Sequence, residues 1–138
     1  MELTKKQMRY FNLAEAASHT STYNRIHIGA VIVKGNNVMS VGMNQNKSHP
    51  IQSEYNIHRE FHIDDSCKHH LHAEMSAIVR IPKYVDLNGA EIYIYRKNGN
   101  DKIAMSRPCN ACFNAIMDRG IKKIHYTTEY GYATETIA

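Results

Sequence analysis

The sequence is poor in the residues that several large classes of protein require. Its 138 residues include no tryptophan, three phenylalanines and three cysteines. No apolar run approaches the about 18 residues of a membrane span. The 17 lysines and arginines exceed the 13 acidic residues and are scattered along the chain. Proteins that bind single-stranded nucleic acid combine a continuous basic groove with stacking aromatics, so the composition argues against nucleic-acid and membrane partners. The net charge of +4 would attract a small anionic substrate.

The cysteines are too few and too unevenly placed for a disulfide framework. Residues 1–9 mix charged and polar side chains without an apolar signal region, so we expect a cytoplasmic protein. In a reducing compartment the closely spaced Cys109 and Cys112 are expected to be metal ligands or a redox pair.

The hydrophobic pattern alternates between strand-like and helix-like segments. The expected helices are 4–17, 72–81 and 109–119, and the expected strands are 28–33, 38–43, 90–95 and 123–128. Residues 44–71 show no sustained period and predict a long loop, where substrate contacts could lie. Alternating strands and helices are typical of an α/β protein, here a three-layer α/β/α sandwich. The length and the lack of a linker or repeat predict a single domain over residues 1–138.

Two short motifs carry most of the chemical information: His-Ala-Glu at 72–74 and Pro-Cys-Asn-Ala-Cys at 108–112. One imidazole and two thiolates make three ligands, the number typical of a catalytic zinc site with a position left for water. Water on such a zinc ionises near neutral pH, and Glu74 stands two residues from the imidazole, where it can carry the proton. The predicted Zn²⁺ ligands are His72, Cys109 and Cys112. The pattern suits hydrolytic deamination, with Glu74 as the catalytic residue.

Other interpretations exist for each half of this pattern. A Cys-x-x-Cys pair alone is also typical of a thioredoxin-like redox site or of half a zinc knuckle. Neither explains the proline before Cys109 together with the upstream His-x-Glu. On the first turn of a helix, Cys109 and Cys112 would lie on one face, and the helix dipole would favour their thiolates. A solvated helix carboxylate is the ordinary role of a glutamate, but the offset of Glu74 from His72 indicates a catalytic one.

The combined His-x-Glu and Pro-Cys-x-x-Cys pair is the known signature of zinc-dependent nucleobase deaminases. The chain resembles the cytidine and deoxycytidylate deaminase superfamily, whose core has the same order of elements as residues 28–128. The resemblance implies a cytidine deaminase-like fold with a central mixed sheet flanked by helices. Family members are commonly oligomers, so the resemblance also implies a homo-oligomer.

The resemblance assigns roles to three residues. Glu74 would deprotonate the water, protonate the pyrimidine N3 and pass a proton to the departing ammonia. Ala73 would offer its backbone N–H to the pyrimidine carbonyl. Asn44, in a Gly-x-Asn at the end of the second strand, would hold the sugar hydroxyl of the substrate, although an asparagine after a strand is by itself more often a turn residue.

The predicted function is zinc-dependent deamination of a cytosine nucleotide, converting dCMP or a close relative to the uracil form with release of ammonia. Its partner is then a small-molecule nucleotide. Two alternatives stay open: a deaminase acting on a base in tRNA or single-stranded DNA, and an inactive zinc-stabilised binding module. Arg107 stands where the tRNA adenosine and guanine deaminases have Glu, which disfavours those readings. Glu74 disfavours the binding module, because a structural zinc site has no use for it.

Several other residues allow both a functional and a structural interpretation. Arg107 could pair with a phosphate or form a surface ion pair. A second, structural zinc occurs in some deoxycytidylate deaminases, and a group of histidines with one cysteine precedes the first motif, although their spacing fits no rule. These residues are His58, His62, Cys67, His69 and His70. The C-terminal tyrosines that could stack on a base or merely pack are Tyr126, Tyr130 and Tyr132.

Overall fold

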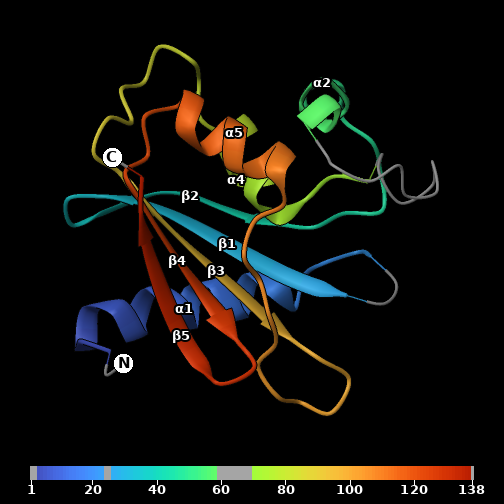
Figure 1. The fold of residues 1–138 in the computed structure, drawn as a ribbon, viewed down its shortest axis with the longest axis vertical. Coiled ribbons are helices and arrows are strands. Elements are labelled where there is room, and N and C mark those ends of the chain that lie inside the picture. Colours follow the sequence, from blue (N-terminus) through green and yellow to red (C-terminus); the bar gives the residue numbers. More distant parts are fainter. Residues whose placement is uncertain (1–2, 24–25, 59–69, 138) are drawn as a thin grey trace.

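The chain folds around one five-stranded sheet. In the computed structural model, which describes residues 3–23, 26–58 and 70–137, the strand order is β2-β1-β3-β4-β5. The strands are β1 (His27–Lys34), β2 (Asn37–Met43), β3 (Glu91–Lys97), β4 (Lys123–Thr128) and β5 (Gly131–Thr136). The helices are α1 (Lys5–Ser18), α2 (Pro50–Tyr55), the 3₁₀ helix η1 (Asn56–His58), α4 (Ala73–Val79) and α5 (Asn110–Asp118). Helix α1 lies on one face and α2, α4 and α5 lie on the other (Figure 1), which confirms the α/β/α sandwich. No helix in these described ranges is both long and apolar enough to cross a membrane.

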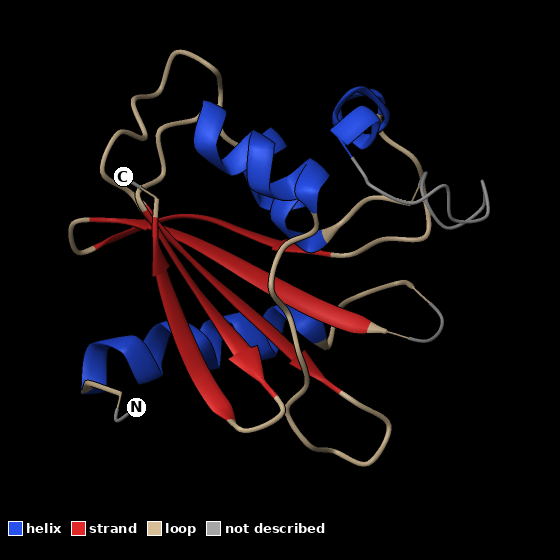
Figure 2. Cartoon of the chain, viewed as in Figure 1, coloured by secondary structure: helices blue, strands red, loops and turns tan. Residues whose placement is uncertain are grey.

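The sheet is mixed, as predicted. Strands β3 and β4 run parallel, whereas β1 pairs antiparallel with both β2 and β3, and β4 pairs antiparallel with β5. Parallel neighbours need a crossover connection, and α5 lies within it. This crossover places α5 next to α4 on one face of the sheet (Figure 2).

Apolar side chains fill both faces of the central strands, because successive residues of a strand point to opposite sides. The core under α4 and α5 includes Ala30, Ile32, Ile92, Ile94 and Ile124. The core under α1 includes Phe11, Val31, Val33, Tyr93 and Tyr95. Burial on both faces explains why β1 has a continuous apolar run instead of an alternating pattern.

Two glycines let helices approach the sheet closely. A Cβ at Gly29 would lie 1.9 Å from the carbonyl oxygen of Ala14 in α1. A Cβ at Gly42 in β2 would lie 2.4 Å from the backbone nitrogen of Ala77 in α4. Gly42 therefore sets the position of α4, the helix that begins at the His-Ala-Glu motif.

Most predicted elements are confirmed, with boundaries shifted by one or two residues. Helix α1 begins after Thr4, which forms a capping box with Gln7. The prediction for residues 44–71 was wrong in part, because α2 and η1 lie inside this segment. The prediction of β4 as the last strand was also wrong, because β5 follows it. The extent of the domain, 1–138, stays a prediction.

Candidate active site

The two predicted motifs meet at the starts of neighbouring helices. His72 is the N-cap of α4 and Cys109 is the N-cap of α5, both with extended backbone conformations. The Nδ1 atom of His72 lies 3.3 Å from Sγ of Cys112 and 3.6 Å from Sγ of Cys109. One ligand atom from each residue falls within 4.8 Å of the other two. These three side chains form a group positioned to bind a metal ion.

The donor set and its spacing fit zinc. With Zn–N and Zn–S bonds of about 2.0 and 2.3 Å, a tetrahedral site separates its nitrogen and sulfur ligands by about 3.6 Å. The observed separations of 3.3 and 3.6 Å are close to this value. A hydrogen bond with Cys112 lowers the pKa of Cys109 to about 3; burial opposes this effect and His72 adds to it. The surroundings thus favour the thiolate, the form that binds metal.

A buried glutamine accepts a hydrogen bond from the backbone of His72. Gln52 in α2 is fully buried, and its Oε1 accepts a hydrogen bond of 3.1 Å from the backbone N–H of His72. The Nε2 group of Gln52 donates to Oδ1 of Asn56 at 2.9 Å. The first N–H groups of a helix have no partner within the helix, so Gln52 both satisfies this group and fixes the start of α4.

Glu74 lies on the first turn of α4 and is 5% exposed. Burial raises its pKa from the usual 4.5 to about 7; the electrostatic interaction with His72 opposes this shift and that with the thiolate of Cys109 adds to it. A carboxyl group with a pKa near neutrality exchanges protons readily in both directions. The structure therefore places a group suited to proton transfer beside the metal ligands.

A cavity of about 380 Å³ opens in front of this group. Its volume falls within the range of small-ligand sites. Tyr23 and His70 form part of its wall, with stacked rings 4.2 Å apart, and the His70 ring lies 4.7 Å from that of His72. The remaining wall includes Asn44, Glu74, Arg96, Met105 and Arg107. Glu74 is the only acidic residue among those lining this cavity in the described part of the chain.

Comparison with known proteins identifies the family. The family model described as the cytidine and deoxycytidylate deaminase zinc-binding region matches residues 4–128. The chain belongs to this family. Membership supports a hydrolase of the cytidine deaminase type, and the family's zinc-binding region contains the His72, Cys109 and Cys112 group.

The chain is similar to several known proteins, at modest sequence identity. ComE operon protein 2 of Bacillus subtilis is 33% identical over 113 residues, which cover 80% of this chain and 52% of that protein. A probable deoxycytidylate deaminase of Caenorhabditis elegans is 29% identical over 126 residues, covering 88% and 57%. The chain thus spans little more than half the length of these two relatives.

Solved structures share the fold. The dCMP deaminase of cyanophage S-TIM5, in apo form, superposes with a TM-score of 0.65 at 24% identity, covering 92% of this chain and 86% of that one. Cytidine deaminase from Burkholderia pseudomallei gives a TM-score of 0.61 at 14% identity, covering 97% and 93%. These similarities confirm the predicted cytidine deaminase-like fold.

Asn44 lies in the cavity wall of this family member but also has a structural role. It is 1% exposed, and its Oδ1 accepts hydrogen bonds from the Ser21 hydroxyl at 2.5 Å and the Ile28 N–H at 3.0 Å. Its Nδ2 donates to the carbonyl of Ile26 at 2.6 Å. Asn44 therefore joins the end of β2 to the segment before β1, and its contact with a substrate stays a prediction.

Of the residues with two interpretations, Arg107 forms an ion pair. Its Nε and Nη2 lie 2.6 and 3.1 Å from the two carboxylate oxygens of Glu135 in β5. Tyr126 packs in the core under α4 and α5. Tyr132 packs against Phe11, with ring centroids 4.6 Å apart, and Tyr130 is exposed. Packing, not base stacking, is the observed role of Tyr126 and Tyr132.

The histidine-rich group falls mostly outside the described residues. His62, Cys67 and His69 lie in 59–69, so the structure does not test the predicted alternative of a second zinc. His70 is described and contacts Tyr23 and the His72 ring, as above. In the described ranges, the His72, Cys109 and Cys112 group is the one cluster of three or more ligating side chains with metal-site spacing.

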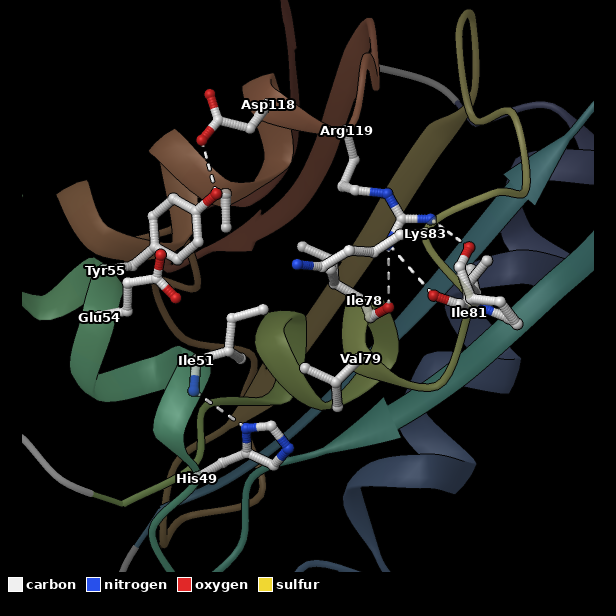
Figure 3. A pocket seen from close by; sticks show the side chains of 12 residues that line it. His49, Ile51, Glu54, Tyr55, Ile78, Val79, Ile81, Lys83, Asp118 and Arg119 are labelled. Atoms are coloured by element: carbon white, nitrogen blue, oxygen red, sulfur yellow. Dashed lines mark hydrogen bonds between the residues drawn. The ribbon is translucent and has the colours of Figure 1, made fainter.

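A larger cavity, about 500 Å³, lies between α2, α4 and the end of α5 (Figure 3). Two of its polar side chains, Arg119 and Tyr55, are hydrogen-bonded within the fold. The Arg119 guanidinium donates to the carbonyls of Ile78, Ile81 and Pro82, where it closes the C-terminal end of α4. The Tyr55 hydroxyl donates to Asp118 at 2.6 Å. His72 and Cys109 of the metal-ligand group line the smaller cavity, which is therefore the candidate active site.

Sequence reasoning missed Gln52, Tyr23 and Arg96. No short-range signal marks them, because each reaches the site from an element distant in sequence from both motifs. An arginine that follows an apolar strand looks like the start of a solvated loop, and a glutamine between a proline and a run of polar residues looks exposed.

Proposed function

We propose that this chain hydrolyses the amino group of a cytosine nucleotide, converting dCMP to dUMP with release of ammonia. The observation that carries the proposal is the burial of Glu74 at the wall of a cavity that is also lined by His72 and Cys109, two members of the metal-ligand group that Cys112 completes. A buried carboxyl group beside three metal ligands has a use in a hydrolase and none in a purely structural zinc site.

The proposed role of the three ligands is to hold Zn²⁺ at the floor of the cavity. Zinc, when bound, supplies the Lewis acidity that makes water a nucleophile at neutral pH. Gln52 keeps His72 in place through its backbone N–H. Glu74 is on the first turn of α4, so its carboxylate lines the same cavity as His72 and Cys109.

Glu74 moves the protons. The attacking water forms a bond to C4 of the cytosine ring while Glu74 accepts a proton from the water and delivers it to N3. Glu74 next accepts the remaining hydroxyl proton and delivers it to the amino nitrogen, so the C4–N bond breaks and ammonia leaves. One carboxyl group suffices for these transfers because they occur in sequence.

Two further contacts are part of the proposal. Ala73 is the first residue of α4, where a backbone N–H has no acceptor within the helix and can donate to the pyrimidine carbonyl. The side-chain amide of Asn44 carries two N–H groups. One donates to Ile26, and the second is proposed to hold the sugar hydroxyl.

The choice of dCMP draws on the relatives. One is a probable deoxycytidylate deaminase, 29% identical over 126 residues. The cyanophage enzyme of the same fold was solved in complex with dCMP and dUMP. We further propose a homo-oligomer that works in the cytoplasm as a single domain.

The test is a panel of substrates with zinc-loaded protein and ammonia release as the readout. The panel comprises cytosine, cytidine, deoxycytidine, dCMP, dCTP, guanine, a tRNA and a single-stranded DNA. We expect dCMP to have the highest kcat/KM. Preference for the tRNA or the DNA would replace the proposal with a polymer-acting deaminase, and inactivity on the whole panel would favour a binding module.

Two variants link activity to the named residues. Glu74→Gln should keep the fold and the zinc but lower the rate at least ~10²-fold, the usual weight of general acid–base catalysis. Cys112→Ser should lose zinc as well as activity. A Glu74→Gln protein that retains activity within a few-fold of wild type would remove this residue from the mechanism.

A further inference from the structure

Among the described residues, two arginines line the active-site cavity, and they differ in whether a carboxylate neutralises their charge. Arg107 directs two nitrogens at the carboxylate of Glu135, at 2.6 and 3.1 Å, and its guanidinium lies 5.3 Å from the centre of the Phe113 ring. This bidentate pair uses the face of Arg107 that would bind an anion. Arg107 is therefore a poor candidate for holding a substrate phosphate.

Arg96 has no such counter-charge within 3–23, 26–58 and 70–137. Its Nη1 donates to the carbonyl oxygen of Met105 at 3.3 Å, and its buried Nε has no hydrogen-bond partner among these described residues. None of the ion pairs among the described residues includes Arg96. Buried donors in native proteins are almost always paired, so an unpaired one on a charged group points to a missing acceptor such as a ligand.

The position of Arg96 in the sheet places it beside the predicted sugar contact. In β3 it follows Ile92 and Ile94 on the face that carries the active site. Its direct partner across the antiparallel pair is Ile28 in β1. The backbone of Ile28 exchanges two hydrogen bonds with Asn44, at 3.0 and 3.2 Å. Arg96 and Asn44 therefore flank Ile28 of β1 on opposite sides, and both line the cavity.

We propose that Arg96 binds the 5′-phosphate of the substrate and makes the site selective for a nucleoside monophosphate over the nucleoside and the free base. This inference rests on the proposed function. A guanidinium offers a planar pair of donors that matches phosphate oxygens, and it keeps its charge at every physiological pH. Glu74 is the only acidic side chain lining the cavity in the described ranges, and none of the ion pairs there joins it to Arg96.

The test compares dCMP with deoxycytidine in wild type, Arg96→Gln and Arg96→Lys. We expect Arg96→Gln to lower kcat/KM for dCMP about 10- to 100-fold, mainly through KM, because a phosphate contact stabilises ground state and transition state alike. Turnover of deoxycytidine should change less than about 3-fold if the arginine acts only on the phosphate. Arg96→Lys should recover part of the loss, since lysine keeps the charge without the fork.

The matched control is Arg9→Gln. Arg9 is in α1, on the opposite face of the sheet, so this variant removes the same charge from the molecule without changing the cavity. It should keep wild-type values with both substrates. Thermal unfolding of all variants shows whether they are folded. Equal losses of dCMP and deoxycytidine turnover in a folded Arg96→Gln protein would overturn the inference and assign Arg96 to holding Met105.

Failure of the proposed function gives a separate result. If zinc-loaded wild type deaminates none of the panel, calorimetric titration with dCMP and with deoxycytidine still tests Arg96. Tighter binding of dCMP by wild type, lost in Arg96→Gln, supports the phosphate contact in a protein that is not a dCMP deaminase. Equal binding of dCMP by the two proteins refutes it.

Discussion

Replacing Gln52 with methionine tests whether the hydrogen bond between Gln52 and the backbone of His72 strengthens zinc binding, because the substitution removes this bond and leaves the proposed metal ligands in place. Methionine has nearly the same length and fills the same buried space without a hydrogen-bonding amide. The variant would leave the N–H of His72 without the acceptor that now lies 3.1 Å away, and would leave Asn56 without its donor at 2.9 Å. The metal-binding atoms themselves would be unchanged.

The expected cost follows from these contacts. A buried N–H that loses its acceptor costs about 1–3 kcal/mol. Loss of a group that orients a metal ligand typically weakens metal binding about 10- to 100-fold. We therefore expect Gln52→Met to lower the free energy of unfolding of the metal-free protein by about 1–3 kcal/mol, and to raise the Kd for zinc about 10-fold.

Urea unfolding of the metal-free protein measures the first quantity, and competition with a chromophoric zinc chelator measures the second. Gln45→Met is the control, because within the described part of the chain the side-chain amide of Gln45 has one hydrogen bond, to the sulfur of Met43 at 3.4 Å. If Gln52→Met bound zinc as tightly as Gln45→Met and unfolded at the same urea concentration, the supporting role of Gln52 would be refuted.

Two other predictions concern packing and charge. Gly42→Ala places a Cβ 2.4 Å from the backbone of Ala77 and should destabilise the fold by about 1–3 kcal/mol or more, whereas Gly99→Ala, with open space around it, should be close to neutral in the same thermal unfolding assay. The hydrogen bond from Lys97 at 2.6 Å is the largest cause that lowers the pKa of Glu15 below 4.5. Since the folded-state pKa is the lower one, the ion pair stabilises the protein above pH 4.5 and this contribution is lost as the pH falls through the folded-state pKa. Glu15→Gln should therefore have a lower Tm than wild type at pH 7, and the two Tm values should converge in acid; a constant difference at all pH values would contradict this explanation.

The sequence predicted the central elements because their hydrophobic patterns are long and uniform. Strand β1 is buried on both faces and therefore reads as a continuous apolar run. Helix α2 was missed because six residues are too few to show a helical period, although Pro50 is at a favoured first position. Strand β5 was missed because most of its residues are half-buried, it begins with a glycine, and its last three residues, Thr134, Glu135 and Thr136, are all polar, so the segment has no alternating apolar pattern.

The residues of the candidate site also fall into those that the sequence indicated and those that it did not. His72, Glu74, Cys109 and Cys112 could be named as candidates from the sequence because they lie within two short motifs whose spacing is typical of a zinc-dependent deaminase. Gln52 and Arg96 could not, because their roles depend on which buried groups the folded chain leaves without partners. A hydrogen-bond acceptor for a helix N-terminus, or a cation without a counter-charge, can be identified only after the sheet and its helices have brought distant segments together.

The metal ligands also have a consequence for the topology of the chain. His72 is separated in sequence from Cys109 and Cys112 by 37 and 40 residues, and β3, the central strand, lies between them. An ion held by all three would close a ring of polypeptide that contains this strand. The ring acts as a reversible cross-link that needs no oxidant, and it removes extended conformations from the unfolded ensemble. We therefore expect the unfolding of β3 and the release of the ion to be coupled.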